Sequence, residues 1–237
     1  MEISNKQIII KSWELLKKNL SFIIMIFLIV ISFHLILSQI QGVFSNTSSI
    51  NNYIFIIASH LFLQGINLGI IRISLNIVNG KERNIADLFG CFNILLGYIM
   101  TSFIYLFILI ITSFPGILLL LLLFSGDLTN LLDYKSIDFG ILIPLLISII
   151  PIIYISIRLQ FYSNILIEEE SGWLDAIKKS YRITNGHVNS VLTLNMILLI
   201  IILLSAIPMF VGLIVSLPLA SIANVYIYTL LKKSNTN

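Results

Sequence analysis

"LSFIIMIFLIVISFHLILSQI", residues 20–40, carries no charged side chain and is long enough to decide the fold class. A helix needs about 20 apolar residues to cross a bilayer core about 30 Å thick. The same pattern recurs along the chain, which has four long runs without Asp, Glu, Lys or Arg: Leu20–Ile71, Leu88–Gly126, Phe139–Ile157 and Ile183–Leu231. The sequence therefore predicts several membrane-crossing helices.

The composition of the whole chain agrees with this prediction. Hydrophobic residues make up 58% of the 237 residues and charged residues 11%, and the mean hydropathy is +1.02. Soluble domains are about half apolar and a quarter charged, so a soluble class is excluded. The single cysteine, Cys91, excludes an internal disulfide and a multi-cysteine metal cluster. A net charge of only +3, without a basic block, excludes a nucleic-acid partner.

The charge-free runs divide into six predicted spans of one integral membrane domain, residues 1–237. We expect an all-α, polytopic transmembrane helical bundle with spans near residues 20–40, 53–74, 93–114, 140–160, 188–208 and 212–231. Pro115–Gly116 is expected to end the third span, because proline removes a backbone donor and clashes with the preceding turn. "PMFVG", residues 208–212, is expected to form the hairpin between the last two spans.

Lys and Arg residues are distributed unevenly between the two sides of this topology. Of the 14 Lys and Arg residues, only Lys135 falls on the side opposite to the two termini. Cytoplasmic loops of membrane proteins carry the excess of Lys and Arg. We therefore expect cytoplasmic N- and C-termini, in the plasma (inner) membrane of a bacterial-type cell.

Charged residues gather in one stretch, "NILIEEESGWLDAIKKSYRITNG", residues 164–186. Three large side chains recur there at helical spacing: Trp173, Ile177 and Tyr181. Basic residues flank this stripe, a pattern typical of a helix lying in the lipid headgroup plane. We expect Ser171 to cap the helix and Asp175 to pair with Lys179 four residues later.

Two other predicted cytoplasmic stretches have the same amphipathic pattern. They are "IIKSWELLKKN", residues 9–19, where we expect a Glu14–Lys18 pair, and "NIADLFGCFN", residues 84–93. The bundle is thus expected to include three short cytoplasmic interfacial amphipathic helices. Each precedes an odd-numbered span, so the chain reads as three loose repeats of interfacial helix plus helical hairpin. The acidic triplet 168–170 is expected to be a solvated cap on the fourth span.

"WLDAIKKSYRITNGHVNSVLTLNM", residues 173–196, and "PLASIANVYIYTLLKK", residues 218–233, carry a family pattern. It consists of an Ala-x-x-x-Ser helix (Ala176 and Ser180), then Gly186–His187, then two spans that end in a Tyr-rich segment. It resembles uncharacterised bacterial multi-pass proteins related to the membrane region of membrane-anchored glycerophosphodiester phosphodiesterases. The resemblance covers the C-terminal part of the chain, with the rest alike in topology only. It implies a multi-pass membrane fold and carries over no catalytic residue.

The best candidate pair of ionisable side chains inside the spans is His34 and His60. We expect both at nearly the same depth in antiparallel neighbouring spans. Imidazole is a common metal ligand, and ionisable groups inside a membrane are functional candidates. A haem or metal held by both rings is one reading. Two neutral histidines that hydrogen-bond across the helices are the other.

Four further polar residues complete the candidate set: Gln64, Asn67, Arg72 and Arg158. The two amides could hold helices together or line a transport pathway. The two arginines could snorkel at the ends of their spans, or line a cytoplasmic vestibule and bind anionic lipid headgroups. No catalytic, cofactor-binding or metal-binding residue is predicted, because HExxH, GxSxG, Walker and dinucleotide motifs are absent from the sequence.

These features predict a non-enzymatic membrane component that transports or binds a lipid or small amphiphile without a cofactor. Its expected partners are membrane lipids and, for an exporter permease, other membrane subunits or an ATPase. The alternative is a membrane scaffold, or a self-protection protein against a membrane-active peptide.

Overall fold

The computed structural model describes residues 4–44, 50–123, 142–169, 171–207 and 212–236. Within these ranges every regular element is a helix. Six of them provide spans long and apolar enough to cross a membrane: α2 (Leu20–Phe44), α3 (Ile50–Val78), α4 (Leu95–Leu123), α6 (Leu142–Leu159), α9 (Val188–Ala206) and α10 (Leu213–Thr236). The all-α polytopic fold is confirmed, and the chain is a multi-pass membrane protein.

The third span differs from its predicted bounds. Pro115 lies inside α4, which continues to Leu123 as a helix of 29 residues, about 44 Å long at 1.5 Å per residue. The predicted end at Pro115–Gly116 is therefore wrong. Membrane helices tolerate an internal proline where neighbouring elements pack against it. A Cβ at Gly116 would lie 2.6 Å from the Pro144 carbonyl oxygen of α6, so this position is a close helix contact.

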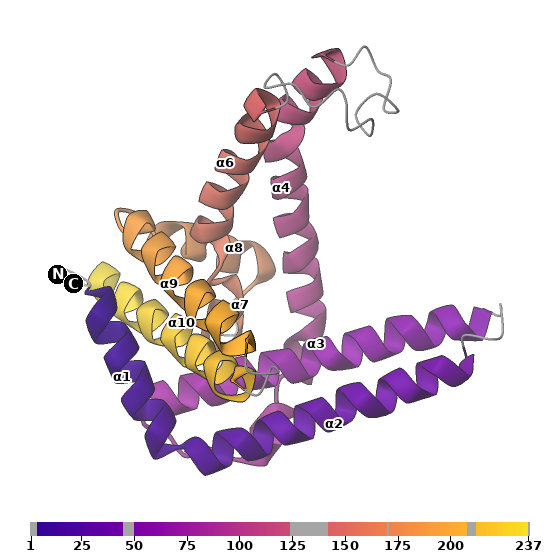
Figure 1. Ribbon diagram of the computed structural model, residues 1–237, viewed down its shortest axis with the longest axis vertical. Helices are drawn as coiled ribbons and strands as arrows, with labels where there is room; N and C mark the ends of the chain where they lie inside the picture. Colours follow the sequence, from indigo (N-terminus) through magenta and orange to yellow (C-terminus); the bar gives the residue numbers. More distant parts are fainter. Residues whose placement is uncertain (1–3, 45–49, 124–141, 170, 208–211, 237) are drawn as a thin grey trace.

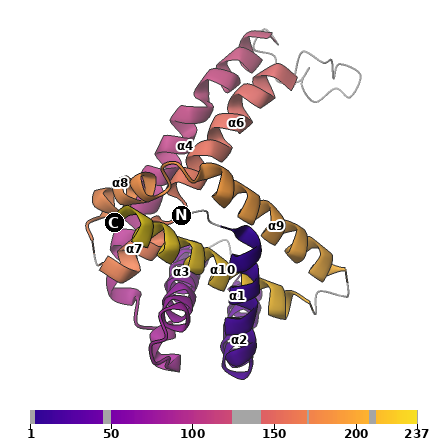
Figure 2. The ribbon, with the colours of Figure 1, turned by 90° about the vertical axis from the view of Figure 1, so that its left-hand side faces the viewer.

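The long helices form three antiparallel hairpins, α2–α3, α4–α6 and α9–α10. In Figure 1 the α2–α3 hairpin points to the right and the α4–α6 hairpin points upward from a common region around α9 and α10. In Figure 2, turned by 90°, α2 and α3 are seen nearly end-on, while α4 and α6 again point upward. The terminal helices α1 (Asn5–Lys18) and α10 pack against each other.

Short helices precede each hairpin, in agreement with the predicted threefold pattern. These are α1 before α2, the 3₁₀ helices η1 (Ile85–Leu88) and η2 (Phe92–Ile94) before α4, and α7 (Tyr162–Glu169) with α8 (Trp173–Ile183) before α9. The second set differs from the expected amphipathic α-helix. Its chain breaks into two single turns, the first held by a capping box between Asn84 and Asp87.

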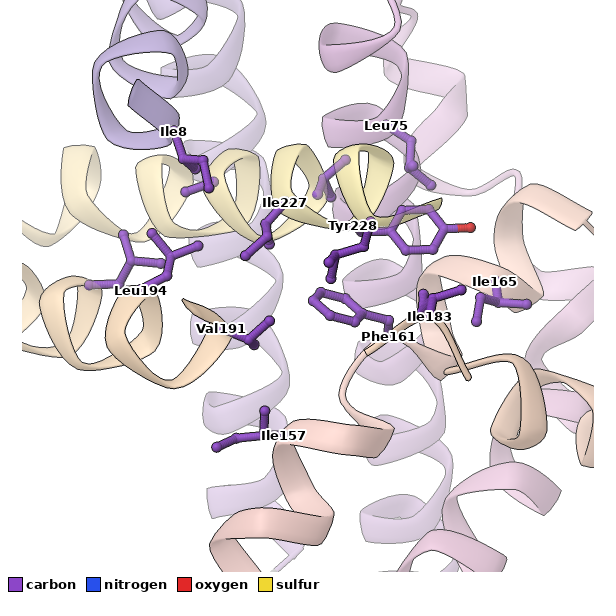
Figure 3. Packing of buried hydrophobic residues seen from close by; sticks show 14 of the residues in the cluster. Ile8, Leu75, Ile157, Phe161, Ile165, Ile183, Val191, Leu194, Ile227 and Tyr228 are labelled. Atoms are coloured by element: carbon purple, nitrogen blue, oxygen red, sulfur yellow. The ribbon is translucent and has the colours of Figure 1, made fainter. Parts of the chain in front are cut away.

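The main hydrophobic core lies where the three hairpins meet, and we call this region the hub. Its buried side chains come from α1, α3 and α6 to α10 and include Ile8, Leu75, Phe161, Leu194 and Tyr228 (Figure 3). A second cluster of buried apolar side chains joins α1, α2, α3, η1 and α10, but many apolar side chains of the spans are exposed. Leu35, Ile150 and Ile207 are 61%, 61% and 76% exposed. Apolar surface of this extent marks contact with membrane, so the two buried clusters are the parts of the fold that protein packing alone stabilises.

The local ion pairs and cap differ from those predicted. Glu14 pairs with Lys11, three residues earlier, and not with Lys18, and its carboxylate raises the pKa of Lys11 by hydrogen bonding and charge. Lys179 pairs with Glu169 of α7, and not with Asp175. Helix α8 has Gly172 as its N-cap without a side-chain hydrogen bond, so the expected Ser171 cap is wrong.

Candidate functional site

A cavity of about 490 Å³ lies beside the hub, bordered by α3, α7, α9, α10 and the chain between α6 and α7. This volume is within the range of small-ligand sites, roughly 300–1,000 Å³. No charged side chain lines it. Its polar lining consists of Gln160, Ser163, Asn164, Asn195, Ser221 and Asn224. The cavity thus presents neutral hydrogen-bonding groups, mostly amides, from helices that are far apart in sequence.

Two of these amides are joined across helices. The Asn195 Nδ2 of α9 donates a hydrogen bond to Gln160 Oε1 at 2.7 Å. Gln160 Nε2 is buried and has no hydrogen-bond partner among the described residues. A buried donor without a partner costs about 1–3 kcal/mol. Gln160, one of the residues that line the cavity, therefore carries a buried donor without a partner in the described part of the chain.

Gln160 reaches the cavity because a helix break precedes α7. Helix α6 ends at Leu159 and α7 begins at Tyr162. The backbone at the break is satisfied by α8: Phe161 N–H donates to Ser180 Oγ at 3.2 Å, and Ser180 Oγ donates to the Arg158 carbonyl at 3.0 Å. Thr184 Oγ1 donates to the same carbonyl at 3.2 Å. The Ala-x-x-x-Ser motif thus has a structural role, since its serine holds this break.

The cavity changes from polar to apolar along α9. Asn195 lies at its polar part, whereas Leu198, Leu199 and Ile202 line it further along the helix. From Asn195 to Ile202 the helix rises about 10 Å. Two of the serines in the lining have partners: Ser221 Oγ lies 2.8 Å from Ser74 Oγ, and Ser163 Oγ donates to Asn164 Oδ1 at 3.3 Å. This gradient suits a molecule with a polar group and an apolar part.

The predicted histidine pair lies elsewhere, in the α2–α3 hairpin. Phe33 and Phe62 have ring centroids 5.3 Å apart, so these levels of the two helices are adjacent, as expected. The imidazoles, however, bond within their own helices. His34 Nδ1 donates to the Val30 carbonyl at 3.0 Å, and His60 Nε2 lies 3.3 Å from Gln64 Nε2.

Both histidines are exposed, and no hydrogen bond found in the described part of the chain joins them. Within the described ranges no group of three or more His, Cys, Asp or Glu side chains is placed to hold a metal ion. Asn67 is exposed on the same helix as Gln64. His34, His60, Gln64 and Asn67 do not line the cavity of about 490 Å³ beside the hub, which we call the amide cavity.

Arg72 has a structural position at the base of α3. Its Nη1 donates to the Gly90 carbonyl at 3.0 Å, and its Nε lies 4.0 Å from Asp87 Oδ1. Asn76 Nδ2 also donates to Asp87, at 3.1 Å. Arg72 therefore ties the 3₁₀ segment to α3, and the predicted snorkelling is not needed to explain it.

Arg158, by contrast, is only 3% exposed at the end of α6. Its Nη1 donates to Asn185 Oδ1 at 3.2 Å, and its Cζ lies 3.7 Å from the centre of the Tyr181 ring. Its Nε is buried without a hydrogen-bond partner, and no ion pair with a described carboxylate is found. A burial this deep contradicts the snorkelling alternative for this residue.

The described acidic residues at the end of the fourth span, Glu168 and Glu169, are exposed, as predicted for a solvated cap, but they also have partners that the prediction did not include. Glu168 Oε2 accepts hydrogen bonds from Tyr228 Oη at 2.7 Å and Lys232 Nζ at 2.9 Å. Glu169 pairs with Lys232 at 2.8 Å and with Lys179 at 2.6 Å. Glu170 lies outside the described residues. The two carboxylates therefore join α7, α8 and α10 in one ion-pair network.

We expect Glu168→Gln to lower the free energy of unfolding by about 1 kcal/mol, because an ion-pair network that also holds a tyrosine is worth more than an isolated surface pair. The measurement is the thermal unfolding midpoint in detergent. Glu14→Gln is the matched control, since Glu14 has one partner and is 57% exposed. Equal shifts for the two variants would contradict the proposed role of the network.

The sequence contained one usable signal for the amide cavity. Gln160, Asn195 and Asn224 are amide residues set in strongly apolar helical runs, and an amide in such a run is costly unless it faces another polar group. The candidates that the sequence suggests come only from the first two spans and the span ends. Which amides meet depends on the contact between α7, α9 and α10, and this contact leaves no local pattern in the sequence.

Comparisons with protein-family models, with curated proteins and with solved structures give no match. The resemblance in the C-terminal part of the chain therefore stays a prediction, and the fold and the cavity carry the functional argument.

Proposed function

We propose that this multi-pass protein is a non-enzymatic membrane component that binds a lipid or small amphiphile in the amide-lined cavity. The observation that carries the proposal is the unused buried donor of Gln160 beside Asn195 in a cavity without charged side chains. A neutral hydrogen-bonding group would satisfy this donor. A bound ion would find no opposite charge in the lining.

The chemistry of the cavity favours an uncharged polar headgroup such as the hydroxyl and ester groups of a diacylglycerol. Leu198, Leu199 and Ile202 would cover the start of an acyl chain. We further propose that the protein lies in the plasma membrane with its termini in the cytoplasm, as the Lys and Arg distribution indicates. Transport would require the same site to open toward either side.

We expect Asn195→Leu to weaken binding of a fluorescent diacylglycerol to the detergent-solubilised full chain by about tenfold, because it removes one amide and leaves Gln160 unpaired. The measurement is a fluorescence titration. Asn189→Leu is the matched control, since Asn189 lies on the same helix, is exposed and does not line the cavity. This control is expected to bind as the wild type does.

Equal affinities of the wild type and Asn195→Leu for the probe would contradict the proposal. Absence of saturable binding by the wild type would also contradict it, and would favour the alternative of a scaffold or self-protection protein. A labelled phosphatidylglycerol serves as a second probe, and the uncharged cavity predicts no effect of Asn195→Leu on it.

A further inference from the structure

A second cavity, of about 560 Å³, lies between α4, α6 and α8 and differs sharply from the first in charge. It is lined by three cationic side chains, Arg158, Lys178 and Arg182, and by no acidic residue. No residue lines both cavities. Tyr181, Asn185 and several apolar residues, among them Ile108 and Ile155, complete the lining.

The cation of Arg158 is the unusual feature of this cavity. It is 3% exposed, yet the side-chain hydrogen bond found for it among the described residues goes to the neutral amide oxygen of Asn185. The Tyr181 ring, 3.7 Å from Cζ, offsets only part of the desolvation cost of a buried charge. A buried arginine without a described carboxylate partner therefore indicates that an anion from outside the chain binds nearby.

The two cations on α8 point to the same conclusion. Lys178 and Arg182 are four residues apart, so they lie on one face of the helix. Both are exposed, and no ion pair with either is found in the described part of the chain. Lys179, which lies between them in sequence, instead forms an ion pair with Glu169. Like charges on one helix face repel, and a shared anion would relieve this repulsion.

We propose that this cavity is a binding site for an anionic phosphate group. A phosphate can accept hydrogen bonds in several directions from guanidinium and ammonium groups at once, which suits three cations arriving from two helices. Ile108 and Ile155 place apolar surface beside the cations. Basic pockets between membrane helices bind anionic lipid headgroups, and free phosphate shares the same recognition chemistry.

The test measures how tightly phosphatidylglycerol and phosphatidylcholine bind to the full chain in detergent, by native mass spectrometry. We expect a clear preference of the wild type for phosphatidylglycerol. Lys178→Gln/Arg182→Gln should weaken phosphatidylglycerol binding about fivefold for each charge removed, or about 25-fold in all. The thermal unfolding midpoint of this double variant should stay near that of the wild type, because the side chains of Lys178 and Arg182 are exposed.

Lys81→Gln/Arg83→Gln is the matched control, since it removes the same two charges from exposed positions outside the cavity. The proposal predicts that this control keeps the preference. An equal loss of phosphatidylglycerol affinity in the two double variants would mean that the lipid is attracted unspecifically to positive charge, and would overturn the proposal. An unchanged preference in Lys178→Gln/Arg182→Gln would overturn it as well.

Inorganic phosphate, added at constant ionic strength, distinguishes the source of the anion. Competition with phosphatidylglycerol that is lost in Lys178→Gln/Arg182→Gln supports a site that accepts free phosphate. Absence of competition, with the lipid preference intact, supports a lipid headgroup as the natural occupant. Asn195→Leu should keep the preference for phosphatidylglycerol, because Asn195 does not line the cationic cavity. The two proposals can therefore fail independently, and the experiments distinguish which one has failed.

Discussion

Gly69→Ala is expected to destabilise the protein by several kcal/mol, a large effect for a single methyl group. Gly69 lies in α3, where the helix contacts the backbone of Leu88 in η1. A Cβ at Gly69 would lie 2.6 Å from both the Cα and the carbonyl carbon of Leu88. Backbone atoms cannot rotate away as a side chain can, so the whole 3₁₀ segment would have to move. Overpacking of this kind costs about 1–3 kcal/mol, and more where backbone must shift.

The displacement of η1 would also disturb its other attachments to α3. Arg72 bonds to Gly90, and Asn76 bonds to Asp87, so both depend on the position of the 3₁₀ segment. The expected result is a lower thermal unfolding midpoint in detergent and faster proteolysis between α3 and α4. The close contact of helix and loop, rather than helix propensity, is the reason for the loss.

Gly97→Ala is the control for this prediction. Gly97 is also inside a helix, α4, but apart from its chain neighbours and the nearby backbone of its own helix no atom lies within 4 Å of a Cβ built there. Replacing a helical glycine by alanine without a clash stabilises by roughly 0.5–1 kcal/mol. The same substitution should therefore have opposite signs at the two positions. A Gly69→Ala variant as stable as Gly97→Ala would show that η1 does not hold its place against α3.

The spans could be predicted from sequence because the bilayer imposes a local rule. A run such as Leu20–Ile40 must be apolar over its whole length, and this is visible without any knowledge of its neighbours. The end of α4 could not be predicted by the same reasoning. Pro115 breaks helices in water, but packing of α6 against the adjacent Gly116 keeps α4 continuous, and this tertiary contact overrides the local preference.

The ion pairs and the cavity could not be predicted from the sequence for a related reason. The spacing rule pairs Asp175 with Lys179 because it considers one helix at a time, whereas Glu169 reaches Lys179 from α7. The histidines stood out in the sequence by their type, yet the hydrogen bonds found for them stay within their own helices. The amides of the cavity are ordinary residue types. Only the meeting of three helices makes Gln160 and Asn195 a candidate site.

Ser180→Ala is expected to give the second large loss of stability, about 2–3 kcal/mol, because one hydroxyl serves both sides of the break between α6 and α7. Without it the Phe161 N–H loses its acceptor and the Arg158 carbonyl loses one of two donors. Ser180 is fully buried, so water cannot easily replace it, and an unsatisfied buried backbone group costs about 1–3 kcal/mol. The measurement is again the thermal unfolding midpoint in detergent.

Ser32→Ala provides the matched control, because Ser32 Oγ donates only to the Leu28 carbonyl of its own helix and is exposed. Its loss is expected to change the midpoint by less than about 0.5 kcal/mol. Because the break also positions Gln160, Ser180→Ala should weaken diacylglycerol binding even below the unfolding temperature. A Ser180→Ala variant that is as stable as the wild type and binds diacylglycerol equally well would contradict this prediction. It would mean that the break between α6 and α7 does not depend on Ser180, and that the Ala-x-x-x-Ser helix has no part in shaping the cavity.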